Sequence, residues 1–426
     1  MAKPFKYDIV FITLAVHGGA FHKIIYTSEI LNEKGFQSKA IFSCESPLGL
    51  QEGIDFEKNN THSLCKGRVQ FLNHAEIFYF VQQTKAKLYV FDHSKTPLIG
   101  RLINEVKKDD GVETAQIGIL FDDIHYWGSD YLFLPHPLTL WFTLEQRQSP
   151  SSKKIIEAKD IFFIGNILAE PVCNVWTSLV RDRSSLFKKY NLNPDLPTCL
   201  FMPNRVDGKH SHYGFIIDSI TNTSINLLIK LHPWEYKNIY HEMDDYFGKK
   251  KTSADKWGVV AIEEKDASWA TSFCDFVVLS GSSVGTEIPL WQKPVIFYSK
   301  KTWRTDIIND ASIRVNSKQF LNKVLTNREW RHFTKEHFER AYQSIHPINI
   351  APNGPIETFI EKVEKIISIS SKKTIGFQDE KALKSLYKPY LHQTKGWSGS
   401  PIRSLRNKII RIKSRIIERF IQYKHN

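Results

Sequence analysis

Short apolar runs alternate with amphipathic helical stretches along most of this chain of 426 residues, and this alternation limits the possible folds more than any other feature. Residues 8–15 form an apolar run that suits a buried strand, residues 21–34 have helical spacing, and residues 38–43 suit a second strand. Gly35 stands where a helix C-cap is expected. The start of the chain therefore predicts a β-α-β unit with two parallel strands.

The alternation continues in two successive series. In the first, further strands are expected at residues 87–92, 116–121, 138–144 and 161–164, and helices at 69–82 and 98–107. In the second, strands are expected at residues 198–202, 225–231, 259–262, 276–279 and 294–298, and helices at 184–190, 330–345 and 355–368. Strands and helices that alternate in this way form mainly parallel sheets covered by helices. The expected fold class is α/β, with two Rossmann-like domains and a ligand cleft at the carboxyl ends of their strands.

A turn-rich stretch near residue 195 predicts the boundary between the two domains. We expect the first domain at residues 1–195 and the second at residues 196–345. Residues 346–400 are expected to supply closing helices and a connector, and residues 401–426 a separate helix at the end of the chain.

The formal net charge of +13 is unevenly distributed. Residues 401–426 contain eight Lys or Arg and one Glu, a net charge of +7, so the other 400 residues carry only +6. Apolar residues recur there at spacings of three and four, from Ile402 to Phe420, which predicts an amphipathic basic helix. Such a helix suits an anionic membrane face, here the inner membrane, better than nucleic acid. Packing on the body or on another subunit is the alternative.

The compartment is predicted from cysteine usage and from hydrophobic segments. The five cysteines are scattered and form no C-x-x-C pair, which disfavours a disulfide framework and a structural zinc site. No signal peptide and no run of 18 apolar residues is evident. We expect a cytoplasmic protein that is attached peripherally to the inner membrane.

Polar and cationic residues follow three strands of the second series. The candidates for binding a phosphorylated ligand are Arg205, Lys230, His232, Ser282, Ser283 and Glu287. Hydroxyls and backbone N–H groups at a helix N-terminus favour a phosphate, and the cations add charge around it. Glu287 lies about one helical turn beyond the serines, where it would reach ribose hydroxyls or hold the loop.

These segments, in this order, resemble a known group of enzymes. Residues 199–205 (CLFMPNR), 230–233 (KLHP) and 280–283 (SGSS), followed by 293–296 (KPVI), are similar to the donor-binding domain of GT-B glycosyltransferases. The nearest patterns are those of CDP-glycerol glycerophosphotransferases and of bacterial capsule, sialyl- or Kdo-type transferases. In those families a His-Pro motif and a Ser-rich motif hold the phosphate of a CMP- or CDP-activated donor. The resemblance therefore implies the GT-B fold, an acceptor-side first domain and a donor-binding second domain.

Two segments of the first domain compete for the role of catalytic base. His17 precedes Gly18 and Gly19 in the first loop, where a histidine can deprotonate an acceptor hydroxyl. Asp122 and Asp123 follow a predicted strand and resemble the paired-acid motif of bacterial sialyl- and polysialyltransferases. The second His-Pro pair, at His136, is expected to be structural or solvated.

The resemblance thus implies a glycosyltransferase. We expect it to be metal-independent, because the chain contains no Asp-x-Asp triplet of the kind that holds a divalent ion in GT-A enzymes. Its expected partners are a nucleotide-activated donor, most simply CMP-Kdo or CMP-sialic acid, and a surface glycan or lipid-linked acceptor; no cofactor beyond this co-substrate is expected. The alternatives are a CDP-glycerol-type glycerophosphotransferase, a sugar-nucleotide 2-epimerase and a non-catalytic subunit of a glycan-assembly complex.

Overall fold

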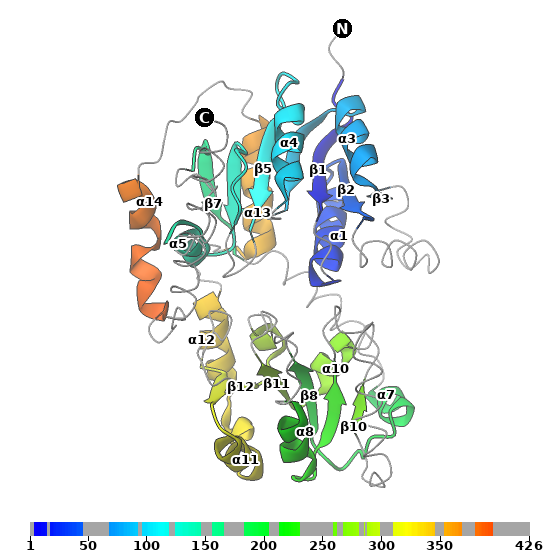
Figure 1. Ribbon diagram of the computed structural model, residues 1–426, viewed down its shortest axis with the longest axis vertical. Coiled ribbons are helices and arrows are strands. Elements are labelled where there is room, and N and C mark those ends of the chain that lie inside the picture. The colour runs from blue at the N-terminus through cyan, green and yellow to red at the C-terminus, as the bar shows by residue number, and fades with distance from the viewer. Residues whose placement is uncertain are drawn as a thin grey trace, which may run out of the picture.

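The computed structural model describes two parallel α/β units that lie end to end along the long axis of the molecule (Figure 1). The described residues are 4–14, 18–45, 68–92, 96–118, 124–145, 156–165, 183–203, 213–230, 259–261, 267–280, 285, 288–298, 310–345, 353–368 and 380–394.

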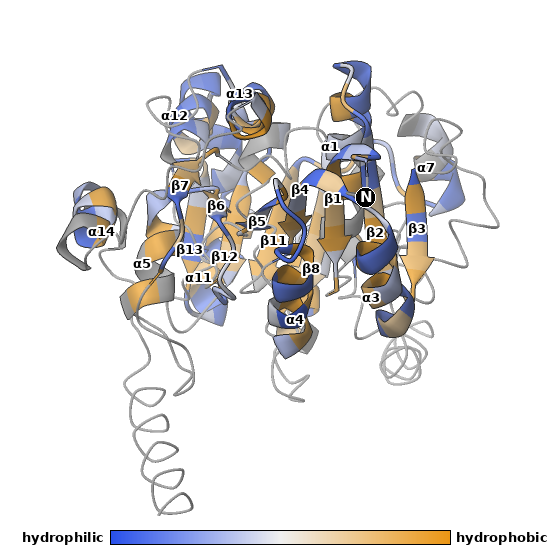
Figure 2. Cartoon of the chain, turned by 90° about the horizontal axis from the view of Figure 1, so that it is seen from above, coloured by the Kyte–Doolittle hydropathy of each residue, from blue (hydrophilic) through white to orange (hydrophobic). Residues whose placement is uncertain are grey.

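The first unit is built on a seven-stranded sheet with the order β3-β2-β1-β4-β5-β6-β7, in which every pair is parallel. Its strands are β1 (Tyr7–Thr13), β2 (Ser38–Ser43), β3 (Val69–Leu72), β4 (Ala86–Phe91), β5 (Glu113–Ile117), β6 (Tyr131–Leu134) and β7 (Asp160–Phe163). Its helices are α1 (Gly18–Glu33), α3 (His74–Gln83), α4 (Pro97–Val106) and α5 (Pro137–Glu145). Strands β1 and β4 carry buried apolar side chains on both faces, because helices cover both faces of the sheet, as Figure 2 shows.

The second unit is a six-stranded parallel sheet with the order β10-β9-β8-β11-β12-β13. Its strands are β8 (Thr198–Pro203), β9 (Asn226–Ile229), β10 (Val259–Ala261), β11 (Phe276–Ser280), β12 (Val295–Tyr298) and β13 (Ser312–Val315). Its helices are α7 (Arg183–Lys189), α8 (Tyr213–Thr221), α10 (Ala267–Phe273), α11 (Lys318–Thr326) and α12 (Lys335–Ile345), with the 3-10 helices η5 (Ile288–Trp291) and η6 (Glu329–His332).

The strand order reverses once in each sheet. In the first sheet β2 and β3 lie on one side of β1 and β4 lies on the other; in the second, β9 and β10 lie on one side of β8 and β11 on the other. The two loops that leave such a pair of strands diverge and open a crevice at the carboxyl ends, which is where ligands bind in these sheets. The carboxyl ends of the two sheets face each other in Figure 1.

The end of the chain returns to the first unit. Helix α13 (Pro355–Ser368) buries one face against the first sheet, and Phe359 packs on Phe11 and Phe133 with ring centroids 6.3 and 4.9 Å away. Helix α14 (Glu380–Tyr387) and the 3-10 helix η7 (Lys388–Thr394) pack near α5. The described helices of residues 346–400 therefore pack on the first unit.

The core of the second unit includes residues that precede the expected domain boundary at residue 195. Phe187 of α7 and Leu192 are buried in a core that also contains Leu200 and Val277 of the second sheet. These two side chains are thus part of the second unit's core.

Two predicted elements were wrong. Residues 69–82, expected to be one helix, form β3 and then α3, because Asn73 caps α3 and exchanges hydrogen bonds with Glu76 in a capping box. Residues 138–144, expected to be a strand, lie in α5, where Pro137 takes the first helical position. A short apolar run fits a buried helix as well as a buried strand. Strands β6 and β13 were not predicted.

None of the described helices combines the length and the apolar character needed to cross a membrane. Among the described residues there is also no group of three or more His, Cys, Asp or Glu side chains placed to hold a metal ion.

Candidate functional site

Three strand ends of the second sheet meet at its point of reversal. Ser280 at the end of β11 pairs with Pro203 at the end of β8. On the other side of β8, the amide of Lys230 donates to the carbonyl oxygen of Phe201 at 2.9 Å, so Lys230 lies directly after β9 beside the end of β8. The structure therefore brings together the three positions from which the chain enters the predicted donor-binding segments.

Of the predicted donor-binding residues, the structure describes Lys230, whose side chain is half-buried. Arg205 follows Pro203 by two residues, and His232 follows Lys230 by two. Ser282, Ser283, Arg205, His232 and Glu287 lie outside the described residues. Their side-chain roles stay predictions that rest on the strand ends just before them.

A second glycine, Gly285, follows the serine-rich segment, and the packing around it leaves no room for a side chain. A Cβ atom at this position would lie 2.6 and 2.7 Å from ring carbons of Phe297 in β12, and 2.8 Å from a methyl group of Leu279 in β11. Both neighbours are fully buried, so neither can move into solvent. Gly285 therefore lets the backbone pack directly on the sheet, two residues beyond Ser283.

The predicted helix N-terminus at the serines lies outside the described residues. The described residues that follow, Gly285 and Ile288–Trp291 (η5), have 3-10 conformation. Phosphate binding at a helix N-terminus here therefore stays a prediction.

A buried carboxylate joins β1 to β4 at the reversal point of the first sheet. Asp92 directly follows β4 and is 5% exposed. One of its carboxylate oxygens accepts a hydrogen bond from the amide of Leu14 at 2.7 Å, and its own amide donates to the carbonyl of Ile12 at 3.1 Å. Sequence reasoning missed Asp92, although an aspartate that ends an apolar strand is a readable signal. His17, three residues beyond Leu14, lies outside the described residues.

The buried side chain of Gln116 anchors the chain segment that follows the predicted acid pair. Its amide nitrogen donates to the carbonyl of His125 at 2.7 Å, and its oxygen accepts from the amide of Trp127 at 2.8 Å. Asp122 and Asp123 lie outside the described residues, in the short interval between the end of β5 and this anchored segment.

The second His-Pro pair has a structural position, in agreement with the interpretation from sequence. His136 is fully buried, its Nδ1 accepts a hydrogen bond from the amide of Leu138 at 3.0 Å, and its ring packs edge-on against Tyr390 of η7. The histidine thus starts α5 and helps to hold the C-terminal segment.

Two of the cysteines are core residues. Cys199 in β8 and Cys274 after α10 are fully buried, and both are free thiols. Burial, and in addition the neighbouring Cys274, raise the pKa of the Cys199 thiol well above its ordinary value. A thiol that stays protonated inside the core is no nucleophile.

Similarity to known proteins is detected through structure. No protein-family model matches the chain, and no curated protein matches its sequence. Solved structures do match over almost their full length. The S. aureus MnaA–UDP structure has a TM-score of 0.56 at 12% identity, over 86% of this chain and 99% of that one. A glycosyltransferase from Rickettsia africae has a TM-score of 0.55 at 13% identity, over 85% and 99%.

The UDP-GlcNAc 2-epimerase from Neisseria meningitidis, solved with UDP-GlcNAc, has a TM-score of 0.55 at 12% identity, over 84% of this chain and all of that one. At such low identity these matches establish the architecture. Two Rossmann-like domains with parallel sheets, matched from end to end by these structures, give this chain the GT-B fold.

Proposed function

We propose that the protein is a glycosyltransferase that takes a sugar from a nucleotide-activated donor and adds it to a surface polysaccharide or lipid-linked glycan. One observation carries the proposal: the ends of β8, β9 and β11 converge at the reversal point of the second sheet, and each leads into a segment of the predicted phosphate site. Solved structures of the same fold in complex with UDP or UDP-GlcNAc support it.

In the proposed reaction a hydroxyl oxygen of the acceptor attacks the anomeric carbon of the donor sugar. The bond from that carbon to the phosphate oxygen breaks, and the hydroxyl proton passes to Asp123, Asp122 or His17. Negative charge then develops on the departing phosphate. We assign its stabilisation to Arg205, Lys230 and His232 together with the hydroxyls of Ser282 and Ser283. Glu287 binds the ribose or holds the loop.

We further propose a pyrimidine nucleotide. The motif resemblance favours a cytidine-linked donor of the Kdo or sialic acid type, whereas UDP is the nucleotide named with several similar structures. Direct competition of CMP, CDP, UDP and GDP for the enzyme separates these possibilities.

A sugar-nucleotide 2-epimerase is the second candidate, because several of the similar solved structures are UDP-GlcNAc 2-epimerases. An epimerase needs no acceptor. Inversion at C2 of UDP-GlcNAc incubated with the enzyme alone would favour this candidate over a transferase.

Donor turnover in variants tests the proposed site. We expect His232→Ala to lower donor turnover at least about tenfold, and one of Asp123→Ala, Asp122→Ala and His17→Ala to do the same, the range of one lost charge-stabilising or acid–base group. The matched controls are His332→Ala and Asp110→Ala, which alter exposed residues away from the carboxyl ends of the strands. Full turnover in His232→Ala and in all three base variants would refute the assignment. Release of CMP with transfer of glycerol phosphate from CDP-glycerol would instead favour the glycerophosphotransferase, and a wild type that binds no nucleotide would favour a non-catalytic subunit.

We also propose that residues 401–426 attach the enzyme to the anionic inner face of the membrane, close to a lipid-linked acceptor. The net charge of +7 and the recurring apolar residues support this role. The segment lies outside the described residues, so the proposal rests on its sequence.

A further inference from the structure

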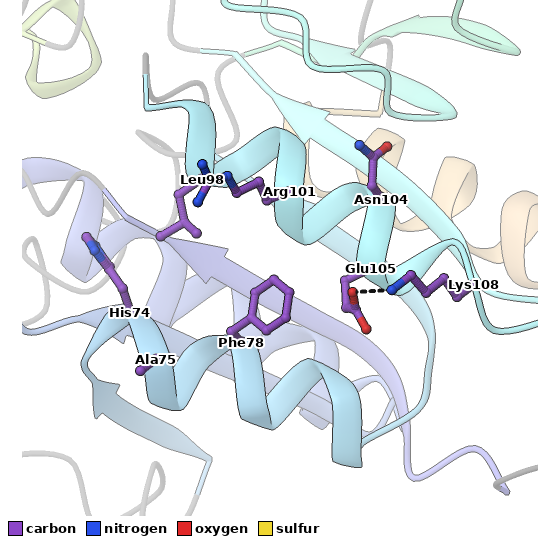
Figure 3. Close-up of a pocket in the computed structure, with 8 residues that line it drawn as sticks. All are labelled: His74, Ala75, Phe78, Leu98, Arg101, Asn104, Glu105 and Lys108. Atoms are coloured by element: carbon purple, nitrogen blue, oxygen red, sulfur yellow. Dashed lines mark hydrogen bonds and ion pairs between the residues drawn. The ribbon is translucent and has the colours of Figure 1, made fainter.

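A groove lies between α3 and α4, the two helices that cover the face of the first sheet opposite α1 and α13. It has a volume of about 590 Å³ and is lined by residues that include His74, Phe78, Leu98, Arg101 and Lys108. Figure 3 shows the ring of Phe78 between the two helices, with His74 and Lys108 toward opposite ends of the groove. The groove is open to solvent, so a ligand bound in it would lie along the surface of the domain.

The groove begins at the edge of the sheet where we place the reaction. Helix α3 starts two residues after β3, and α4 starts six residues after β4. Both helices therefore begin at the carboxyl edge and run away from it, about 15 Å for ten residues each. His74 and Leu98, near the two helix starts, mark the end of the groove at that edge, the edge at which Asp92 closes β4.

The histidine at this end is held in place. Glu45, which follows β2, accepts a hydrogen bond from the amide of His74 at 2.7 Å and contacts its ring nitrogen Nδ1 at 2.7 Å. The carboxylate of Glu45 and the imidazole of His74, which follow the neighbouring strands β2 and β3, therefore hold each other at the mouth of the groove.

The lining combines an apolar surface with polar groups along the rim. Phe78 and Leu98 are partly buried against the core of the first domain, so each presents part of its side chain to the groove. This combination suits a carbohydrate, whose rings have apolar faces and whose hydroxyls form hydrogen bonds.

The charges in the groove favour an acidic ligand. Glu105 is already paired with the ammonium of Lys108 at 2.7 Å and accepts from the side chain of Gln82 at 3.1 Å. Arg101 is exposed in the groove wall and has no ion pair or hydrogen bond with the described residues. A guanidinium in this state is suited to a carboxylate or phosphate, which it binds through two parallel hydrogen bonds.

We propose that the α3–α4 groove binds an acidic stretch of the acceptor glycan, with Arg101 on a carboxylate or phosphate group and Phe78 against a sugar ring. This inference rests on the proposed function, since it assigns the groove to the acceptor of that reaction. It makes the enzyme selective for extended, acidic acceptors over short or neutral ones.

Calorimetric titration of the full-length protein tests the proposal with three probes: hexagalacturonate, which carries carboxylates; a glycerol phosphate hexamer, which carries phosphates; and neutral maltohexaose. We expect at least one acidic oligomer to bind about tenfold more tightly than maltohexaose. Arg101→Glu should weaken that binding at least about tenfold. Arg328→Glu, at an exposed arginine of the second domain, should leave it unchanged. The preferred oligomer identifies the acidic group.

Phe78→Leu keeps an apolar side chain but removes the ring face, and should weaken binding without changing the charge. Equal binding of both acidic oligomers by wild type and Arg101→Glu would overturn the proposal, as would absence of binding or no preference over maltohexaose. Nucleotide binding is measured in the same samples. If Arg101→Glu has no effect while a nucleotide still binds, only the groove assignment fails; if no nucleotide binds, the proposed function fails.

Discussion

Replacement of Gly285 by alanine tests whether the serine-rich segment is held by direct packing on the second sheet. The added Cβ would lie 2.6 Å from the tip carbon of the Phe297 ring and 2.8 Å from a Leu279 methyl group. Carbon atoms pack best at about 3.5–4.0 Å, so the overlap is close to 1 Å on two sides. Because both neighbours are fully buried, the strain cannot be relieved into solvent. We expect Gly285→Ala to lower the free energy of unfolding by about 2–3 kcal/mol, the upper part of the range for overpacked cores.

Urea unfolding of a double-mutant cycle measures this effect. Phe297→Leu removes the ring carbons that clash and should by itself cost about 1–3 kcal/mol through lost packing. Combined with Gly285→Ala it should cost at least about 1 kcal/mol less than the sum of the two single changes, because the smaller side chain leaves room for the methyl group. Costs that add within about 0.5 kcal/mol would refute the packing argument.

Gly100→Ala is the matched comparison. Its Cβ would lie 3.1 Å from a ring carbon of Trp127, a closer contact than usual but a milder one than at Gly285. The site is inside α4, where alanine gains about 1 kcal/mol of helix propensity over glycine. We expect this variant to stay within about 1 kcal/mol of the wild type.

Three further predictions concern other parts of the chain. Phe359→Ala should destabilise the first domain by about 3–5 kcal/mol in urea unfolding, because a fully buried ring that joins α13 to the first sheet is lost; a cost under about 1 kcal/mol would contradict the packing of α13. Burial raises the pKa of Asp8, but its hydrogen bonds from Lys87 and the amide of Gln37 outweigh burial and leave that pKa below the ordinary value. Its stabilisation is therefore present above the unfolded pKa of about 3.9 and is lost as the pH falls through the folded pKa, so the stability difference between wild type and Asp8→Asn should shrink from pH 6 to pH 3. Deletion of residues 401–426 should abolish flotation with anionic vesicles, and unchanged flotation would refute the membrane role.

Much of the fold could be predicted from the sequence because buried parallel strands are continuous apolar runs. Strand β2 has the predicted bounds, and α1 and β4 differ from theirs by a few residues. The helix α3 was misplaced although its N-cap was readable, since Asn73 precedes Glu76 by three residues in a capping box. Strand β13 was missed because its partly exposed residues do not form an apolar run.

The part of the site that could be predicted consists of polar residues that directly follow strands. Lys230 could be identified from its place after a strand, and the structure puts it beside the end of β8. The need for glycine at position 285 depends on how β11 and β12 are paired, which no local pattern contains. The α3–α4 groove combines side chains of two helices that become neighbours only through the strand order, so no local pattern predicts it.

The central claim is that a nucleotide binds at the converging ends of β8, β9 and β11. The thermal midpoint of unfolding of the full-length protein, measured with saturating CMP, CDP, UDP or GDP, tests it most directly, because a ligand that binds only the native state must raise the midpoint. We expect a pyrimidine nucleotide to raise it and GDP to have little effect, and the increase to be smaller in Lys230→Ala. The account would be contradicted if none of the four nucleotides raised the midpoint. It would also be contradicted if the midpoint rose as much in Lys230→Ala and in His232→Ala as in the wild type.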